Sequence, residues 1–206
     1  MRADKQTKAR VVKVNESGAI KLAIKVLKQG GVIIYPTETC YGIGCDFENE
    51  EAKERIYEMK ERPKEKKFIV IVDSLKTARR YFKLDKKSML IVRALVKRFM
   101  PGPLTLAVSE NFAFRISSHP FALALTRKFK KPIVSTSANL SGRQPIYEIG
   151  KILNVFREKV DLIVDGGDLP RRKPSTVFDV RKLRAVREGE IREKEIVEFL
   201  KNKGLI

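Results

Sequence analysis

Short apolar runs alternate along this chain with longer amphipathic segments, and this alternation constrains the fold more than any other feature. Runs such as 32–35 and 133–136 have the length and apolar character of buried strands. Between such runs, apolar residues recur at the spacing of one helix face, for example over 17–29. Strands that alternate with helices are typical of α/β folds.

The pattern predicts the positions of the individual elements. We predict helices over residues 17–29, 49–61, 73–82, 85–99, 120–129, 147–158 and 193–203. We predict strands over residues 32–35, 68–72, 104–108, 112–116, 133–136, 162–164, 176–180 and 184–187, with a loop over 36–47. Ser17 and Asn49 are expected to cap their helices, and Pro120 to lie in the first turn of its helix.

The sheet is expected to be mixed. Residues 104–108 and 112–116 are separated by a three-residue turn, which indicates an antiparallel hairpin within an otherwise interleaved chain. The sequence therefore predicts an α/β fold in one domain over 1–206, with a twisted, mixed parallel and antiparallel sheet flanked by helices. Its core is expected over about 15–190, and a helix over 193–203 closes the chain.

Several protein classes are excluded by composition. No apolar run approaches the ~20 residues that span a bilayer, so we expect no membrane partner. Residues 1–5 are charged and precede no apolar segment, which is unlike a signal peptide, so we expect a cytoplasmic protein. Cys40 and Cys45 are two thiols without further ligands nearby, too few to close a zinc site.

The net charge of +19 favours polyanionic partners such as RNA, nucleotides and phosphates. Lysine and glutamate are both abundant, as on thermophile surfaces, which explains the number of charges but not their imbalance. The basic residues are spread along the chain and form no single RNA-binding motif.

Acid–base machinery is sparse in this sequence. It contains neither a P-loop nor a G-x-G-x-x-G fingerprint, and its single histidine, His119, is expected to order the start of the helix at Pro120. A Ser-His-Asp triad is therefore not expected. Hydroxyls, amides and cations remain, which are the groups that hold anions and stabilise charge in a transition state.

The segment STSANLSG, residues 135–142, follows the apolar strand at 133–134. It carries four hydroxyls, one carboxamide and one glycine, without an acid or a base. Such small donors and acceptors suit a polar, charged or phosphorylated ligand, although a plain Ser/Asn-rich turn has the same composition.

Other polar segments also begin or end predicted strands. They are YPTETCYG at 35–42, KERPKEK at 60–66, PGPLT at 101–105, PSTV at 174–177 and REG at 187–189. Each alone is also typical of an ordinary turn or a solvated charged surface.

Together these segments resemble the YrdC-type threonylcarbamoyl-AMP synthases. The resemblance runs from about Gly30 to Gly189 and includes the stretch from Arg115 to His119. It implies a twisted α/β sheet with a concave basic face. It also implies synthesis of L-threonylcarbamoyladenylate from L-threonine, bicarbonate and ATP, with release of diphosphate, for N6-threonylcarbamoyladenosine modification of tRNA.

The resemblance also implies roles for individual residues. Those expected to bind threonine are Thr37, Tyr41, Arg115, Ser135 and Ser175. Those expected to bind ATP are Lys60, Arg62, Lys66, Ser137, Asn139 and Arg187, with Ser141 and Arg143 beside them. Lys60 and Arg62 would be catalytic through charge neutralisation. Mg²⁺ would be held mainly by the phosphates of ATP, with no metal ligands from the protein.

The sequence departs from the family near the basic segment. Many members have a proline after the K-x-R-P turn and a histidine at the end of the next strand, where this chain has Ile71. Ile71 cannot hydrogen-bond threonine. Two alternatives therefore stay open: a noncatalytic module that binds double-stranded or ribosomal RNA, and a carbamoyl-transfer relative that acts on another amine. Expected macromolecular partners are tRNA or double-stranded RNA and a threonylcarbamoyl transferase complex.

Overall fold

The computed structural model describes residues 8–206. The strands are β1 Arg10–Lys13, β2 Ile33–Pro36, β3 Tyr41–Gly44, β4 Ile69–Ile71, β5 Leu104–Ala107, β6 Ala113–Arg115, β7 Ile133–Val134, β8 Thr136–Ser137, β9 Leu162–Asp165, β10 Thr176–Asp179 and β11 Arg184–Arg187. The helices are α1 Ala19–Lys28, α2 Glu50–Lys60, α3 Leu75–Ala78, α4 Lys86–Phe99, α5 Pro120–Phe129, α6 Ile149–Phe156 and α7 Glu193–Asn202. The expectation for residues 1–5 lies outside the described residues, and the single-domain organisation stays a prediction.

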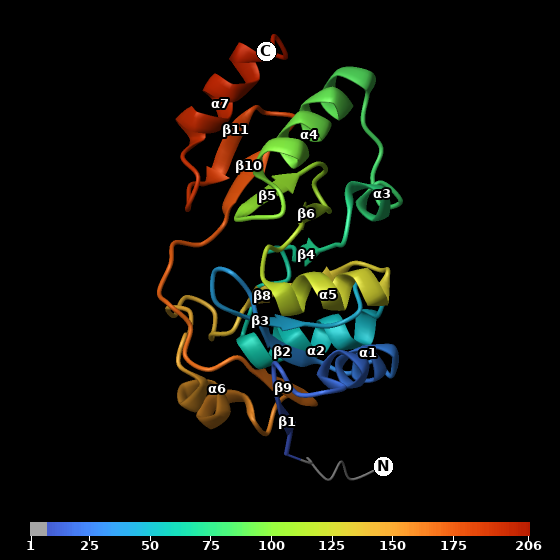
Figure 1. Ribbon diagram of the computed structural model, residues 1–206, viewed down its shortest axis with the longest axis vertical. Helices are drawn as coiled ribbons and strands as arrows, with labels where there is room; N and C mark the ends of the chain where they lie inside the picture. Colours follow the sequence, from blue (N-terminus) through green and yellow to red (C-terminus); the bar gives the residue numbers. More distant parts are fainter. Residues whose placement is uncertain (1–7) are drawn as a thin grey trace.

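The predicted mixed α/β fold is confirmed, and its strands are divided between two sheets (Figure 1). A five-stranded sheet has the order β1-β9-β2-β3-β8, and a six-stranded sheet has the order β11-β10-β5-β6-β4-β7. Each contains parallel and antiparallel pairs, and β5 and β6 form the predicted antiparallel hairpin. In Figure 1 the six-stranded sheet lies with α4 and α7 at one end of the molecule, and the five-stranded sheet lies towards the other.

Both faces of the five-stranded sheet are buried at its inner strands β2 and β9, which explains why these two strands read as continuous apolar runs. Successive side chains of a strand point to opposite faces. Thus Ile33 and Tyr35 pack in a cluster with residues of α1 and α5, whereas Val32 and Ile34 pack in a second cluster with residues of α2 and α6. A third cluster joins the six-stranded sheet to α4 and α7.

Two predicted helix starts are confirmed by their hydrogen bonds. The Oδ1 atom of Asn49 accepts a 2.8 Å hydrogen bond from the backbone of Ala52 at the start of α2. His119 Nδ1 accepts a 3.2 Å hydrogen bond from the backbone of Phe121 at the start of α5, where Pro120 occupies the first turn. These side chains satisfy backbone N–H groups that have no partner within the helix.

Three local predictions are wrong. Ser17 does not cap α1: Gly18 occupies that position with φ of 90°, a conformation that favours glycine. The helix predicted over 73–82 is the single turn α3: Ser74 caps its start through Thr77, and beyond it the N–H groups of Arg80 and Tyr81 bind carbonyls three residues back, which does not continue an α-helix. The loop predicted over 36–47 contains strand β3, and β1 was not predicted at all.

Strand β3 escapes prediction because glycine disfavours strands. Here Gly44 is required by close packing against β2 and β7. A Cβ atom on Gly44 would lie 2.3 Å from the carbonyl oxygen of Val134 and 2.9 Å from the ring of Tyr35. Tertiary contact therefore overrides propensity at this strand.

We expect Gly44→Ala to lower the free energy of unfolding by about 1–3 kcal/mol or more, because the added methyl group has no room. Gly150→Ala is the matched control: Gly150 lies in α6 with nothing within 4 Å of an added Cβ, so the variant should gain about 0.4–1 kcal/mol. Urea unfolding of both variants measures the difference. Equal stabilities would contradict the packing account of β3.

Candidate functional site

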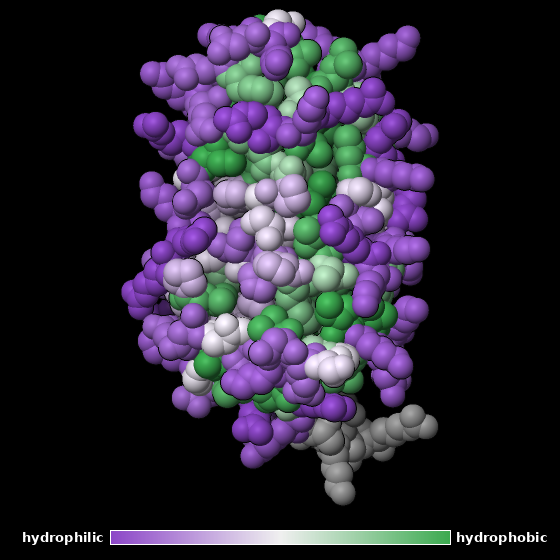
Figure 2. Space-filling model, in the orientation of Figure 1, coloured by the Kyte–Doolittle hydropathy of each residue, from purple (hydrophilic) through white to green (hydrophobic). Residues whose placement is uncertain are grey.

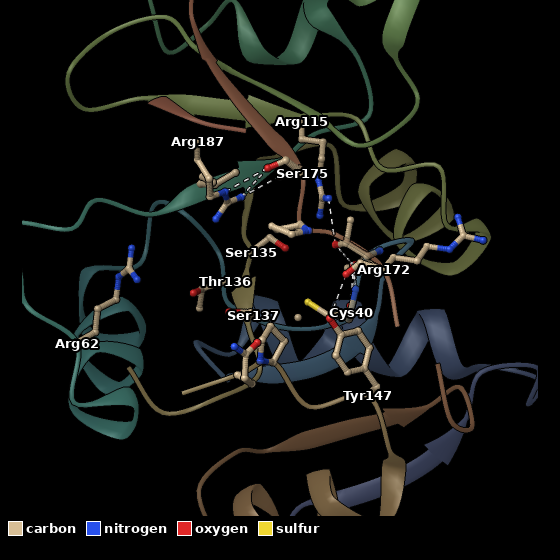
Figure 3. Close-up of a pocket in the computed structure, with 17 residues that line it drawn as sticks. Cys40, Arg62, Arg115, Ser135, Thr136, Ser137, Tyr147, Arg172, Ser175 and Arg187 are labelled. Atoms are coloured by element: carbon tan, nitrogen blue, oxygen red, sulfur yellow. Dashed lines mark hydrogen bonds between the residues drawn. The ribbon is translucent and has the colours of Figure 1, made fainter. Parts of the chain in front are cut away.

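A pocket of about 370 Å³ lies where the two sheets meet (Figure 3). Its walls come from the β2–β3 connection, β4, β6 and β11, and from the segments around 135–147 and 172–175. Seven of the residues predicted from the sequence line it: Thr37, Arg62, Arg115, Ser135, Ser137, Ser175 and Arg187. The structure thus brings together residues from six separate sequence segments.

Ser135 is the residue at which the chain passes from one sheet to the other. Strand β7, just before it, pairs with β4 of the six-stranded sheet. Strand β8, just after it, pairs with β3 of the five-stranded sheet. The strand predicted over 133–136 is therefore split at this position. The backbone N–H of Ser135 donates to the carbonyl of Ile69 at 2.8 Å, which anchors the crossing on the pocket wall.

Lys60 supports the serine segment from beneath and does not line the pocket. Its side chain is buried, with the residue 2% exposed, and Nζ donates to the carbonyl oxygens of Ser137 and Asn139, each at 2.5 Å. Burial, and then the charge of Arg62, lower the pKa of Lys60 to about 8. Lys60 therefore shapes the loop, and its predicted contact with ATP phosphates stays a prediction.

Asn139 is also part of the loop's internal framework. Its side-chain amide donates to the carbonyls of Leu140 and Arg143 at 2.7 and 2.6 Å. Its Oδ1 atom accepts a 2.5 Å hydrogen bond from Ser137 Oγ. These bonds close the turn at 139–143 and hold Ser137 at the pocket wall.

Arg62 is held by backbone carbonyls of the turn that follows it. Nε and Nη2 donate to the carbonyls of Lys66 and Lys67, each at 3.0 Å, and the guanidinium lies 5.3 Å from the ring centre of Phe68. Lys66 thus contributes its carbonyl to the site, while its own side chain is exposed. Because carbonyls carry no formal charge, Arg62 keeps its full positive charge for a ligand.

Arg187, at the end of β11, is held in the same way. Its guanidinium donates to the carbonyl of Ser175 at 2.9 and 3.2 Å and to Ser175 Oγ at 3.2 Å. The same Oγ lies 3.0 Å from Oγ1 of Thr105, so the PGPLT segment contacts the site through its last residue. Burial, followed by the charge of Arg115, lowers the pKa of Arg187 from its ordinary value.

Arg115 is bound differently, by a carboxylate. Its Nη1 atom lies 3.0 Å from Oε1 of Glu38 in an ion pair whose side chains are only 6% and 10% exposed. Ser117 Oγ donates to the other carboxylate oxygen of Glu38. Nη1 also contacts Thr39 Oγ1 at 3.4 Å, and Thr39 lies 3.1 Å from Thr37 Oγ1. The pair joins the β2–β3 connection to the end of β6, and thus one sheet to the other.

Several predicted residues lie away from the pocket wall. Tyr41 is buried, and its hydroxyl donates to the carbonyl of Gly167 at 2.7 Å and accepts from the backbone of Gly166 at 2.9 Å. Lys66 and Arg143 are exposed, and Ser141 is half-buried outside the lining. For these residues, and for Asn139 and Lys60, ligand binding stays a prediction.

Ile71, at the position of the family histidine, is fully buried and does not line the pocket. It packs in the apolar cluster that contains Ile133 and Phe121. The departure from the family pattern therefore adds an apolar core contact at the far end of β4.

Sequence reasoning missed Glu38, Thr39, Tyr147 and Arg172. Glu38 and Thr39 stand within the PTET segment, so the signal for them was present in the residues. Tyr147 and Arg172 line the outer part of the pocket and are linked by a 3.1 Å hydrogen bond from the tyrosine hydroxyl to the arginine carbonyl. Neither belongs to a recognisable pattern, and only the fold brings them together.

The pocket is strongly cationic. Four arginines, Arg62, Arg115, Arg172 and Arg187, line it together with the hydroxyls, and no carboxylate does so among the residues that the structure describes. Figure 3 shows Arg62 and Arg115 on opposite sides of the space. The space-filling view shows polar residues gathered at the waist of the molecule (Figure 2). Such an arrangement suits a ligand with several anionic groups. The concave basic face that the family resemblance implies stays a prediction.

Comparisons with known proteins agree with this geometry. The family model Sua5_yciO_yrdC, described as "Telomere recombination", matches residues 25–189. A threonylcarbamoyl-AMP synthase of Marinobacter nauticus is 37% identical over 175 residues, covering 78% of this chain and 90% of that protein.

Solved structures give the same result. The crystal structure of P. abyssi Sua5 complexed with L-threonine matches with a TM-score of 0.81 and 29% identity over 94% of this chain. This chain spans 61% of the length of that protein. E. coli YciO matches with a TM-score of 0.76 and 27% identity, covering 92% of this chain and 98% of that chain.

The lowered pKa of Lys60 generates a test by pH. Between about pH 8 and pH 10.5 the unfolded chain holds the Lys60 proton and the folded chain has released it, so the folded state gains stability as pH rises. The free energy of unfolding of the unmodified protein, minus that of Lys60→Met, should therefore increase by about 1–3 kcal/mol from pH 7 to pH 10.

Lys66→Met is the control, because Lys66 is exposed. Its difference from the unmodified protein should stay flat over the same range. If the difference in unfolding free energy between the unmodified protein and Lys60→Met also stays flat or falls, the hydrogen bonds to the two carbonyls keep Lys60 protonated despite its burial.

Proposed function

Because this chain belongs to the Sua5/YciO/YrdC family, we propose that it makes L-threonylcarbamoyladenylate from L-threonine, bicarbonate and ATP, with release of diphosphate. The proposal rests on one observation: the pocket has a part suited to phosphates and a part suited to a small amino acid. Arg62 and Arg187 offer unpaired positive charge for phosphates, while Arg115, Thr37 and Thr39 offer a compact set of donors for a small amino acid.

The chemistry begins with the amine of threonine, which condenses with bicarbonate to give a carbamate. A carbamate oxygen then attacks the α-phosphate of ATP, the new O–P bond forms, and diphosphate leaves with the electron pair of the broken bond. Catalysis of such a nucleotidyl transfer rests on positioning and charge neutralisation. Arg62 and Arg187 neutralise phosphate charge, and Ser135 and Ser137 hold the reacting groups together at the crossing between the sheets.

Mg²⁺ is part of the proposal as a companion of ATP. Within residues 8–206 no group of three or more His, Cys, Asp or Glu side chains is placed to hold a metal ion. The hydroxyl and guanidinium lining fits an ion that is bound by the phosphates of the nucleotide and by water. Such an ion would offset the charge of the phosphates.

The proposed product is an activated, labile adenylate, so its use requires a transferase that places the threonylcarbamoyl group on tRNA. We propose that this handover takes place in the cytoplasm. None of the helices in residues 8–206 combines the length and the apolarity needed to cross a bilayer.

Contact with tRNA is proposed on a separate surface. Four cationic side chains, Lys76, Arg79, Arg80 and Arg93, surround one hollow on α3 and α4. Residues 74–109 contain nine basic residues and one acidic residue, Asp85. None of the four cations makes an ion pair within the described part of the chain, so their charges are available to a phosphate backbone.

The proposed reaction predicts that the purified protein releases diphosphate from ATP only when L-threonine and bicarbonate are both present. Calorimetry with L-threonine, L-serine and ATP distinguishes the alternatives. A carbamoyl-transfer relative would prefer another amine, and an RNA-binding module would bind neither amino acid nor ATP. Release of diphosphate at the same rate without threonine would refute the proposal.

We expect Arg62→Ala to slow diphosphate release about ten- to a hundredfold, because it removes a charge-assisted contact worth ~1.5–3 kcal/mol. Lys64→Ala is the matched control. Lys64 lies two residues further on, and its exposed ammonium pairs with Glu54 at 2.6 Å outside the pocket. The Lys64→Ala variant should release diphosphate at the unmodified rate. Equal rates in the two variants would place Arg62 among the surface cations.

For tRNA, the double variant Arg79→Gln/Arg93→Gln should reduce the slope of log affinity against log salt by about 2, with ATP turnover unchanged. Lys201→Gln, on helix α7 and outside the hollow, should leave the slope as it is. If the double variant binds tRNA with the original slope, the hollow on α3 and α4 is not the contact surface.

A further inference from the structure

Within residues 8–206, Glu38 is the one acid that forms an ion pair with a cation of the pocket wall. Its carboxylate pairs with Arg115 at 3.0 Å and accepts a hydrogen bond from Ser117. In the part of the chain that the structure describes, the other three wall cations, Arg62, Arg172 and Arg187, make no ion pair. The pocket is therefore electrically divided: Arg115 with Glu38 forms a neutral unit, and the remaining wall is cationic.

The carboxylate of Glu38 lies behind the pocket wall, so it acts on a ligand through its charge and not by direct contact. The pair is buried, yet Oε1 of Glu38 and Nε of Arg115 have no hydrogen-bond partner, although Oε1 lies close to Nη1. Buried polar groups without a partner are costly and usually have a functional reason. Here a buried negative charge stands directly behind a positive one at the pocket wall.

We propose that Glu38 makes the Arg115 side of the pocket selective for a zwitterion, namely an α-amino acid, over a simple carboxylate. The inference rests on the proposed function and names a residue that determines its specificity. A carboxylate alone gains from Arg115 and is repelled by Glu38. An amino acid presents a carboxylate to Arg115 and an ammonium that is attracted by Glu38. The neutral unit therefore favours a ligand whose own net charge is zero.

The same division orients the two substrates. Anionic phosphates are drawn to Arg62 and Arg187, where the positive charge is not neutralised, and are disfavoured beside Glu38. Figure 3 shows Arg115 and Arg62 across the pocket from each other. Glu38 thus keeps the amino-acid end of the pocket from being occupied by ATP phosphates or by small anions.

The test compares L-threonine with (R)-3-hydroxybutyrate, which keeps the carboxylate and the hydroxyl but lacks the ammonium. Calorimetry, with competition for the weaker ligand, gives the affinity ratio of the two. Glu38→Gln keeps the size of the side chain and removes its charge. It should lower the preference for L-threonine about ten- to a hundredfold, the effect of one unit charge at short range in a partly screened site.

Three further variants separate charge from structure. Glu38→Asp keeps the charge and should keep the preference, even if both ligands bind more weakly. Glu38→Gln/Arg115→Gln replaces the ion pair by two amides, leaves no unpaired buried charge and should fold even if the single variant does not. Without Glu38 nothing in this unit attracts the ammonium, so the preference of the double variant should lie below that of the unmodified protein. Glu48→Gln, at an acid paired with Lys131, should change nothing.

The outcomes are distinguishable. If the unmodified protein does not bind L-threonine, the proposed function falls, and this inference with it. If L-threonine binds and Glu38→Gln leaves the preference unchanged within twofold, the role of Glu38 is refuted while the proposed function stands. A double variant that keeps the full preference would also refute it, because the preference would then not depend on the charge of Glu38.

Discussion

The crossing of the chain at Ser135, from one sheet into the other, is the constraint on which the rest of the site depends. A backbone that leaves a sheet must find new partners for its N–H and carbonyl groups. The carbonyl of Ile69 binds the N–H of Ser135, and the buried ammonium of Lys60 binds the carbonyls of Ser137 and Asn139. Lys60 thus supplies hydrogen-bond donors that a neighbouring strand would otherwise supply, and the loop that it holds forms one wall of the pocket.

The way in which each arginine is held decides what it offers to a ligand. Arg62 and Arg187 are fixed by backbone carbonyls, which orient the guanidinium without cancelling its charge. Arg115 is fixed by the carboxylate of Glu38, which orients it and cancels its charge. Two cationic contacts and one neutral contact within a single pocket match a substrate pair made of a polyphosphate and a zwitterion.

Much of the fold was readable from local patterns. The apolar face of 17–29, the cap at Asn49 and the hairpin of 104–116 all depend on residues close in sequence, and all are present in the structure. Strand β3 was not readable, because its two glycines oppose a strand locally, and Gly44 is required only by the approach of Val134. The division into two sheets was not readable either, because hydrophobic alternation shows that a strand is buried but not which strand is its neighbour.

For the site, the sequence by itself determined the chemical inventory: hydroxyls, amides and arginines at the ends of strands, in an order that resembles one family. Only the tertiary structure decided how that inventory is used. It placed Lys60 beneath the loop, turned Tyr41 towards Gly167, and set Glu38 against Arg115. The physical reason is that local sequence limits which groups a segment carries, whereas partners, burial and net charge depend on contacts between residues that are distant along the chain.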